Sequence, residues 1–233
     1  MKAAKVTTRP APTPRPKVPT PEIPAEEPVT DGARTWFIAL LVIGVIVLGA
    51  TSAIAFGRTM PSWEQHIFTI INSVQTPKWV TSQFAKPLSD AVFGILALIG
   101  VLLLVPRYRK RAWQYAVAGG STYVFTFVIE HIINRARPAG LTHDVVLRAS
   151  QGGAGFPSGH VATLAALCLT VWLFVSWPWR IALVVLVAAE AWSRMFLGVH
   201  APLDTVGGVG AACIVVAILH LAPRKLRKLF WLD

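Results

Sequence analysis

Long apolar stretches separated by short polar segments set the pattern of this chain. The stretches with few or no charged residues are 35–56, 88–105, 112–127, 161–177, 181–189 and 205–221. A helix that crosses the hydrocarbon core of a bilayer needs about 20 mostly apolar residues. Most stretches reach this length alone, and the third and fifth reach it only with polar residues at one end. The pattern therefore predicts an all-α integral membrane bundle of six transmembrane helices.

The segment at 62–79, after the first predicted helix, is too polar to cross a membrane. Its isoleucines recur at helical spacing and tryptophans stand near its ends: Ile67, Ile70, Ile71, Trp63 and Trp79. Helices that lie in the plane of the membrane interface have this pattern. We therefore expect an interfacial helix on the outer face of the bundle.

Both ends of the chain differ in composition from its apolar centre. Residues 1–33 are rich in proline, threonine, alanine and charge, and such a segment buries too little apolar area to fold. We expect a disordered cytoplasmic tail, either a spacer or a docking site for a proline-reading partner. It is too long and too proline-rich for a cleavable signal peptide. Residues 34–223 form the predicted transmembrane domain, and 224–233 a basic cytoplasmic tail.

The net charge of +11 does not indicate nucleic-acid binding, because the basic residues do not gather in one patch. Most of the 22 Lys and Arg residues lie on one side of the predicted bundle, in the N-terminal tail and at 107–111, 180 and 224–228. Cytoplasmic segments of membrane proteins carry this excess. We expect a multi-pass cell-membrane protein with both termini in the cytoplasm. The connections that contain residues 57–87, 134–158 and 200–202 then lie outside.

Small residues inside the predicted helices say less about function. Cys168 and Cys213 are expected to be packed thiols rather than a disulfide or a metal site. The run GGVGAA at 207–212 permits close helix packing, within one subunit or between subunits. The oligomeric state therefore stays open.

Polar residues gather at the predicted outer ends of the third to sixth helices. They are Glu130, His131, Arg135, Arg137 and Pro138, then Pro157, Ser158, Gly159 and His160, and finally the segments 193–200 and 201–204. Ionisable residues at membrane depth are costly and usually face a bundle interior or a watery cavity. Arginines, histidines and an aspartate on one face form a candidate anion site.

The segment PSGH at 157–160 has the features of a phosphate-binding helix start. Ser158 is a favourable N-cap residue, and Gly159 allows a ligand to approach the backbone. Free N–H groups at the positive end of a helix dipole favour an anion. His160 lies in the first turn, where it can deliver a proton.

The remaining residues supply a nucleophile and positive charge. His200 and Asp204 are four residues apart, so the carboxylate can orient one imidazole nitrogen and leave the other free to attack. Arg137 and Arg194 can hold phosphoryl oxygens and neutralise their charge. This set predicts phosphoryl transfer without a metal or other cofactor.

These motifs resemble those of the type 2 phosphatidic acid phosphatase superfamily, whose signature is K-x6-RP, PSGH and SR-x5-H-x3-D. The second motif is intact at 157–160, and the third is intact from Ser193 and Arg194 through His200 to Asp204. The first motif keeps Arg137 and Pro138, but Glu130 stands where the family has lysine. The similarity in architecture covers about residues 35–223.

The resemblance implies a role for each matching residue. His200 would form a phosphohistidine intermediate, Asp204 would orient it, and His160 would protonate the leaving lipid oxygen. Phosphate would be held by Arg137, Ser158, Gly159 and Arg194. No metal is implied.

Glu130 reverses the charge expected at its position, and three interpretations stay open. It pairs with Arg137 or Arg194 while another cation contacts phosphate; it contacts a hydroxyl-rich or cationic head group; or the protein is a weak or inactive phosphatase. The cations on the expected face are Lys78, Lys86, Arg135 and Arg148. Lys110 is about 30 Å away along a helix. Glu190, one turn before Arg194, is expected to hold that arginine or to form a plain buried ion pair.

Two functional hypotheses follow from the sequence. The first is an enzyme that removes phosphate from a lipid phosphate or polyprenyl diphosphate at the outer membrane face. The second is a non-catalytic protein on the same scaffold that binds or transports lipid phosphates. The expected partners are the lipid substrate and membrane lipids. The motifs read only the phosphoryl group, so they do not identify the lipid.

Overall fold

The computed structural model describes residues 31–150 and 152–231, and these residues form helices and loops without a strand. The predicted tail at 1–33 lies almost entirely outside this part of the chain. The α-helices are α1 (Asp31–Ala55), α2 (Ser62–Asn72), α3 (Lys86–Leu103), α4 (Arg109–Ile133), α5 (Gly159–Val171), α6 (Trp177–Phe196), α7 (Pro202–Leu221) and α8 (Arg224–Trp231). The all-α prediction is confirmed.

Each predicted apolar stretch has a helix, but the boundaries differ in the middle of the chain. The fifth stretch, predicted at 181–189, lies inside the much longer α6, whose polar ends the apolar pattern did not include. The fourth, predicted at 161–177, is the short α5 followed by a 3₁₀ turn at Trp172–Phe174. Among the described residues, four helical segments are long and apolar enough to cross a membrane: Gly32–Ala55, Val80–Leu103, Arg109–Gly140 and Pro202–Leu221.

Helices α5 and α7 form the centre of the bundle. Side chains of α5 from Val161 to Cys168 are all buried, and so are most of those of α7. The outer helices instead expose apolar residues on their lateral surfaces, for example Val42, Leu98 and Val185. An exposed apolar surface of this extent fits contact with lipid. The central position of α5 and α7 explains why the residues at their starts can meet.

Glycines bring α1 and α7 into close contact. A Cβ on Gly44 of α1 would lie 2.9 Å from the carbonyl oxygen of Gly210, and a Cβ on Gly210 would lie 2.9 Å from Leu48 N. A Cβ on Gly207 would lie 2.5 Å from the Phe156 ring, and a Cβ on Gly208 would lie 2.7 Å from the Ser158 carbonyl oxygen. The small-residue run at 207–212 therefore serves packing inside the subunit.

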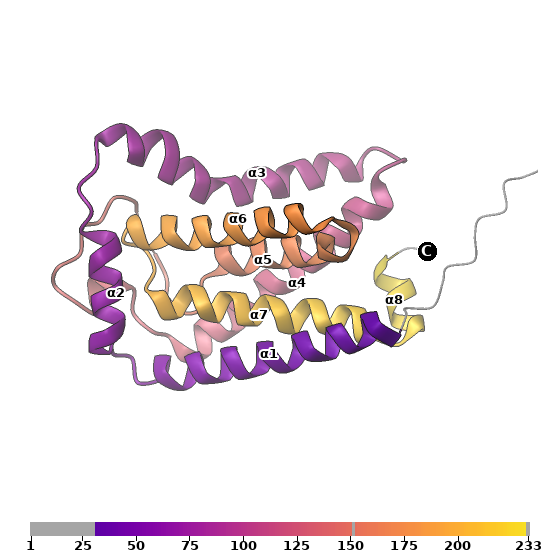
Figure 1. The fold of residues 1–233 in the computed structure, drawn as a ribbon, viewed down its shortest axis with the longest axis horizontal. Coiled ribbons are helices and arrows are strands. Elements are labelled where there is room, and N and C mark those ends of the chain that lie inside the picture. The colour runs from indigo at the N-terminus through magenta and orange to yellow at the C-terminus, as the bar shows by residue number, and fades with distance from the viewer. Residues whose placement is uncertain (1–30, 151, 232–233) are drawn as a thin grey trace, which may run out of the picture.

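The two short helices lie at opposite ends of the bundle (Figure 1). Helix α2 crosses the end where the connections between α4 and α5 and between α6 and α7 lie. Helix α8, within the predicted basic tail, lies at the other end beside the start of α1. On α2, Glu64, Phe68 and Asn72 are buried, whereas Ile67 and Ile70 are exposed.

Candidate functional site

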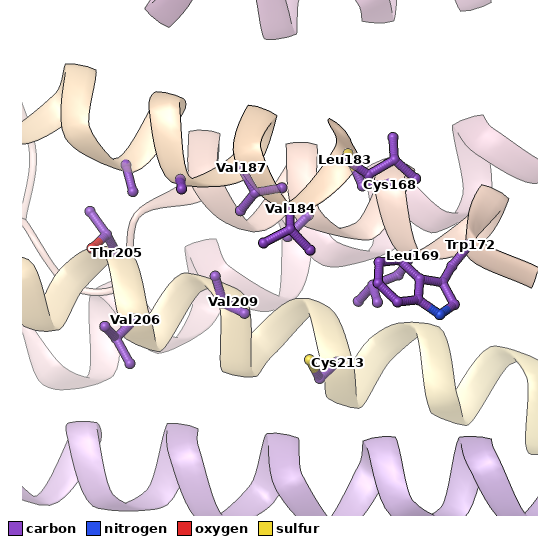
Figure 2. Close-up of a pocket in the computed structure, with 13 residues that line it drawn as sticks. Cys168, Leu169, Trp172, Leu183, Val184, Val187, Thr205, Val206, Val209 and Cys213 are labelled. Carbon is purple, nitrogen blue, oxygen red and sulfur yellow. The ribbon is translucent and has the colours of Figure 1, made fainter. Parts of the chain in front are cut away.

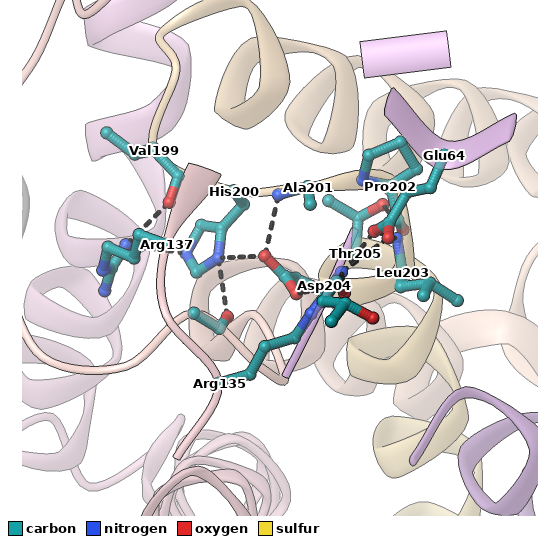
Figure 3. Close-up of polar contacts among 12 residues, drawn as sticks. Glu64, Arg135, Arg137, Val199, His200, Ala201, Pro202, Leu203, Asp204 and Thr205 are labelled. Atoms are coloured by element: carbon teal, nitrogen blue, oxygen red, sulfur yellow. Dashed lines mark hydrogen bonds and ion pairs between the residues drawn. The ribbon is translucent and has the colours of Figure 1, made fainter. Parts of the chain in front are cut away.

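The candidate site centres on His200, in the connection between α6 and α7 (Figure 3). Its Nδ1 lies 2.9 Å from the Gly155 carbonyl oxygen and 3.5 Å from Asp204 Oδ2. Its Nε2 lies 3.3 Å from Arg137 Nη1. Two acceptors at Nδ1 and a donor at Nε2 favour the neutral imidazole with hydrogen on Nδ1. The lone pair is then on Nε2, the nitrogen that faces Arg137.

The surroundings of His200 keep its ring neutral near pH 7. Burial lowers the pKa of His200 to about 4, and the charges of Arg194 and Arg137 act in the same direction. The hydrogen bond and the charge of Asp204 oppose this decrease. A neutral imidazole has the lone pair that a nucleophile requires.

The Asp204 carboxylate makes contacts on both sides. Its Oδ2 accepts from Ala201 N at 2.7 Å, which caps α7, and its Oδ1 accepts from Arg135 Nη1 at 3.0 Å. Gly155 is fixed next to it, because Gly155 N donates to the Arg135 carbonyl at 2.7 Å. A Cβ on Gly155 would lie 3.2 Å from Asp204 Oδ2, so this position suits glycine.

Arg137 follows α4 and points toward His200. Its Nη1 donates to the Val199 carbonyl at 2.9 Å, and its Nε to the Gly153 carbonyl at 3.4 Å. Asn134 ends α4 in the left-handed region, with φ of 48°. This turn at the helix end directs the following residues, including Arg135 and Arg137, back toward α7.

The PSGH segment forms the start of α5, as predicted, but Ser158 does not cap it with its side chain. Ser158 N donates to the Asp204 carbonyl at 2.8 Å, while its Oγ is buried without a hydrogen-bond partner among the described residues. Ser158 therefore holds the expected N-cap position, but its side chain does not make a capping bond. The first N–H groups of a helix have no intrahelical partner, and those after Ser158 remain suited to an anion.

His160 lies in the first turn of α5, near His200 and near the charges of Arg194 and Arg137. Phe93 of α3 packs edge-to-face against it, with 4.9 Å between ring centroids. The ring therefore has a fixed place on the α3 side of the site.

Arg194 is buried at the end of α6, and its Nη1 contacts Ser89 Oγ on α3. Its Nε has no hydrogen-bond partner among the described residues. The predicted pair with Glu190 is not formed, because both carboxylate oxygens of Glu190 are buried without a hydrogen-bond partner in the described chain. Arg194 is instead held by α3, which sequence spacing could not indicate.

Glu130 lies in the last turn of α4, partly buried. Its side chain makes no ion pair or hydrogen bond with the described residues, so the expected direct pairing with Arg137 or Arg194 is absent. Its charge nevertheless acts on Arg137. A Cβ on Gly153 would lie 2.9 Å from Glu130 Oε1. Glu130 therefore stands beside the loop that supports Arg137.

Two of the four cations considered as substitutes for the missing lysine are engaged elsewhere. Arg148 donates to the carbonyls of Asn72 and Phe196, at 2.8 and 2.6 Å, and stacks on the Phe196 ring. Arg135 binds Asp204 and Glu64. Lys78 and Lys86 are exposed. Lys110 lies in the first turn of α4 and Glu130 in its last, which agrees with the predicted separation.

Glu64 is the site residue that sequence reasoning missed. It is fully buried on α2, and its Oε2 lies 2.5 Å from Arg135 Nη2. Arg135 in turn reaches Asp204, so a buried chain of charges runs from α2 to His200 (Figure 3). The only sequence signal was a carboxylate at helical spacing with Phe68 and Asn72.

A cavity of about 330 Å³ lies between α5, α6 and α7 (Figure 2). Its lining is apolar and includes Leu169, Trp172, Val184 and Val209. It contains none of the candidate catalytic or phosphate-binding residues. Cys168 and Cys213 line it as free thiols, as predicted.

In the described part of the chain, no group of three or more His, Cys, Asp or Glu side chains is placed to hold a metal ion. The groups assembled around His200 are its own imidazole, the imidazole of His160, the guanidinium groups of Arg137 and Arg194, and the start of α5. These groups are suited to bind a phosphate group next to His200 Nε2.

Residues 111–228 match the sequence profile of the PAP2 superfamily, and this half of the chain includes the three motifs. The chain belongs to the PAP2 superfamily. The decaprenylphosphoryl-5-phosphoribose phosphatase of Mycobacterium tuberculosis is 37% identical over 128 residues, which cover 54% of this chain and 68% of that protein. The putative undecaprenyl-diphosphatase YbjG of Escherichia coli is 28% identical over 157 residues, 64% of this chain and 76% of that protein.

Solved structures of this superfamily have the same fold. LpxE of Aquifex aeolicus gives a TM-score of 0.56 at 25% identity, over 68% of this chain and 94% of that one. A transmembrane PAP2 type phosphatidylglycerolphosphate phosphatase from Bacillus subtilis gives a TM-score of 0.58 at 17% identity, over 81% of this chain and 98% of that one. At this identity the likeness is evidence for the fold only. The PAP2 protein described here is a membrane phosphatase of the lipid-phosphate class.

Proposed function

We propose that this PAP2 phosphatase removes a terminal phosphate from a polyprenyl-linked lipid through a phosphohistidine intermediate, without a metal ion. The observation that carries the proposal is the geometry of His200, whose Nδ1 faces two acceptors and whose Nε2 faces Arg137. The second and third motifs are intact, and their assembly around one imidazole favours catalysis over the hypothesis of a non-catalytic lipid-binding or transport protein.

The reaction proceeds in two steps. His200 Nε2 attacks phosphorus as the bond to the leaving oxygen breaks, and His160 donates a proton to that oxygen. Water then attacks phosphorus, His160 accepts a proton from it, and the P–N bond breaks to release phosphate. Arg137, Arg194, Ser158 and Gly159 hold the phosphoryl oxygens. The phosphate dianion in turn favours the protonated form of His160 that the first step requires.

We further propose six membrane-spanning helices, α1 and α3 to α7, with α2 at the outer interface. The site and α2 lie at one end of the bundle, and the basic α8 and the start of α1 lie at the other (Figure 1). Exposed Trp63, Ile67 and Ile70 on α2 support an interfacial position. The positive-inside pattern supports cytoplasmic termini and an active site that faces outside the cytoplasm.

Phosphate release from a panel of lipids tests the proposed function. The panel contains farnesyl diphosphate, phosphatidate, phosphatidylglycerol phosphate and a polyprenylphosphoryl-5-phosphoribose. We expect the purified protein to act on a polyprenyl-linked member and to keep its rate within about twofold in EDTA, because no step uses a metal. A protein inactive on every member, or one inactivated by EDTA, would contradict the proposal.

Glu130 is proposed to select the head group. It stands beside Arg137 without a partner in the described chain, and the Mycobacterium tuberculosis relative is named for a phosphoribose substrate. A carboxylate accepts hydrogen bonds from sugar hydroxyls, and a bond to a charged group contributes about 1.5–3 kcal/mol. We therefore expect Glu130→Gln to reduce kcat/KM for the polyprenylphosphoryl-5-phosphoribose about tenfold or more.

Farnesyl diphosphate, which has no hydroxyl-bearing group, is the comparison substrate, and its kcat/KM should change much less. Glu130→Lys should shift the preference further toward the diphosphate. His131→Ala, at the neighbouring exposed position, is the matched control. An equal loss of kcat/KM on both substrates in Glu130→Gln would contradict head-group selection. An equal gain on both substrates in Glu130→Lys would instead identify a phosphatase whose general activity Glu130 lowers.

A further inference from the structure

The Glu64 carboxylate on α2 is held entirely by hydrogen-bond donors. Its Oε1 accepts from Arg135 Nη1 and from Leu203 N, each at 3.1 Å, and its Oε2 accepts from Arg135 Nη2 at 2.5 Å. A carboxylate that accepts from a guanidinium and a backbone N–H is in its ionised form. Both Glu64 and Arg135 are fully buried, so neither charge is screened by water.

Arg135 is shared between two carboxylates. Its Nη1 also donates to Asp204 Oδ1 at 3.0 Å, and Asp204 is fully buried. One positive charge thus balances two negative charges, and the buried trio of Glu64, Arg135 and Asp204 keeps one net negative charge. Without the charge of Glu64, the positive charge of Arg135 would fully balance the negative charge of Asp204, and the group would have no net charge.

This residual charge acts on His200, whose Nδ1 lies 3.5 Å from Asp204 Oδ2. The imidazole becomes cationic when Nε2 bonds to phosphorus, and nearby negative charge stabilises that state. The other groups that act on His200 are Arg137 and Arg194, both cationic, and their charges disfavour it. The trio is therefore the source of negative charge that offsets them.

We propose that Glu64 is a positioning residue for the nucleophile: it shares Arg135 with Asp204, so that the trio keeps a net negative charge beside His200 and Asp204 stays oriented toward His200. This inference rests on the proposed function of His200. It also gives α2 a part in the site beyond an interfacial position. Glu64 and Arg135 are 71 residues apart in sequence, and α2 lies outside the matched residues 111–228.

The test is Glu64→Gln in the full chain, with farnesyl diphosphate as the probe. The amide keeps the shape of the side chain and removes its charge. We expect kcat to fall about 10–100-fold and KM to stay within about twofold, because the groups that hold phosphate are unchanged. The double variant Glu64→Gln/Arg135→Gln removes both charges and should recover part of the lost kcat. Gln65→Ala, which removes the 2.9 Å bond from α2 to Thr142 Oγ1, is the control and should keep wild-type kcat.

The pH profile separates this role from simple anchoring of α2. Protonation of His200, whose pKa is about 4, causes a loss of activity at acid pH. Burial raises the pKa of Glu64, so the protonation of Glu64 adds to this loss of activity. Charged and titratable groups from the neighbouring elements act on His200: Arg137 after α4, His160 on α5, Arg194 on α6 and Asp204 on α7. The charge of Glu130 acts on Arg137. Activity is present above these pKa values and is lost as the pH falls. Glu64→Gln should move this acid limb to lower pH.

A readout without turnover keeps the inference testable if the lipid probe is wrong. The modification of His200 by diethyl pyrocarbonate, measured by peptide mass spectrometry, reports the neutral imidazole directly. Its pH midpoint should also move lower in Glu64→Gln and stay unchanged in Gln65→Ala. An unchanged midpoint, or an activity loss that lies in KM alone, would overturn the role of Glu64. A wild-type protein that releases no phosphate from any probe would count against the proposed function instead.

Discussion

The His200→Ala variant is expected to lose at least about 10³-fold in kcat, because it removes the proposed nucleophile that forms the covalent intermediate. His200 Nε2 faces Arg137, and Nδ1 is occupied by Gly155 and Asp204. The measurement is inorganic phosphate release from the most active lipid of the panel. Rapid quench with isolation of the phosphoenzyme adds a direct readout: wild type should form an acid-labile phosphohistidine, and the variant should form none.

His143→Ala is the matched control for this experiment. It removes an imidazole that is exposed in the connection between α4 and α5, and it should keep wild-type kcat. Thermal unfolding of His200→Ala should confirm that it folds. A folded His200→Ala protein that keeps more than about a tenth of wild-type kcat would rule out His200 as the nucleophile.

The His160→Ala variant is expected to lose about 10²–10⁴-fold in kcat on a lipid phosphate, the usual contribution of a general acid or base. The size of the loss should depend on the leaving group. An alkoxide leaving group needs the proton, whereas p-nitrophenolate leaves without one. In His160→Ala, the rate of phosphoenzyme formation from p-nitrophenyl phosphate should therefore fall less than the rate from the lipid phosphate, by about tenfold or more.

Phe93→Leu is a suitable comparison variant, because it removes only the edge-to-face contact that holds the His160 ring. It should reduce kcat moderately on lipid phosphate and keep the wild-type dependence on the leaving group. If His160→Ala lost equal activity on both substrates, His160 would hold phosphate rather than donate a proton.

Much of the local structure follows from the sequence alone. Apolar stretches located the described helices α1 and α3 to α7, and PSGH marked the start of α5. The short separation of His200 and Asp204 indicated their approach, and the contact forms although His200 precedes α7. The end of α4 near Arg137 was also correctly placed. These predictions succeed because they depend on the geometry of one short segment.

Other predictions failed where a neighbouring element supplied a better partner. Ser158 leaves its hydroxyl unpaired and uses its backbone N–H on the Asp204 carbonyl. Glu190 shares a helix face with Arg194, yet the guanidinium contacts Ser89, which is 105 residues away. Spacing along a helix indicates which contacts are possible, and packing against α3 decides which contact forms.

The sequence by itself determined the helices, the superfamily motifs and the set of groups available for phosphoryl transfer. Only the tertiary structure decided how those groups are held. The Gly155 carbonyl that meets His200 is 45 residues away in sequence, and Glu64 is 71 residues from Arg135. The physical reason is that helical periodicity fixes neighbours within one segment, whereas the register between α2, α4 and α7 depends on the packing of the whole bundle. A buried carboxylate such as Glu64 therefore shows its role only when its partners are in place.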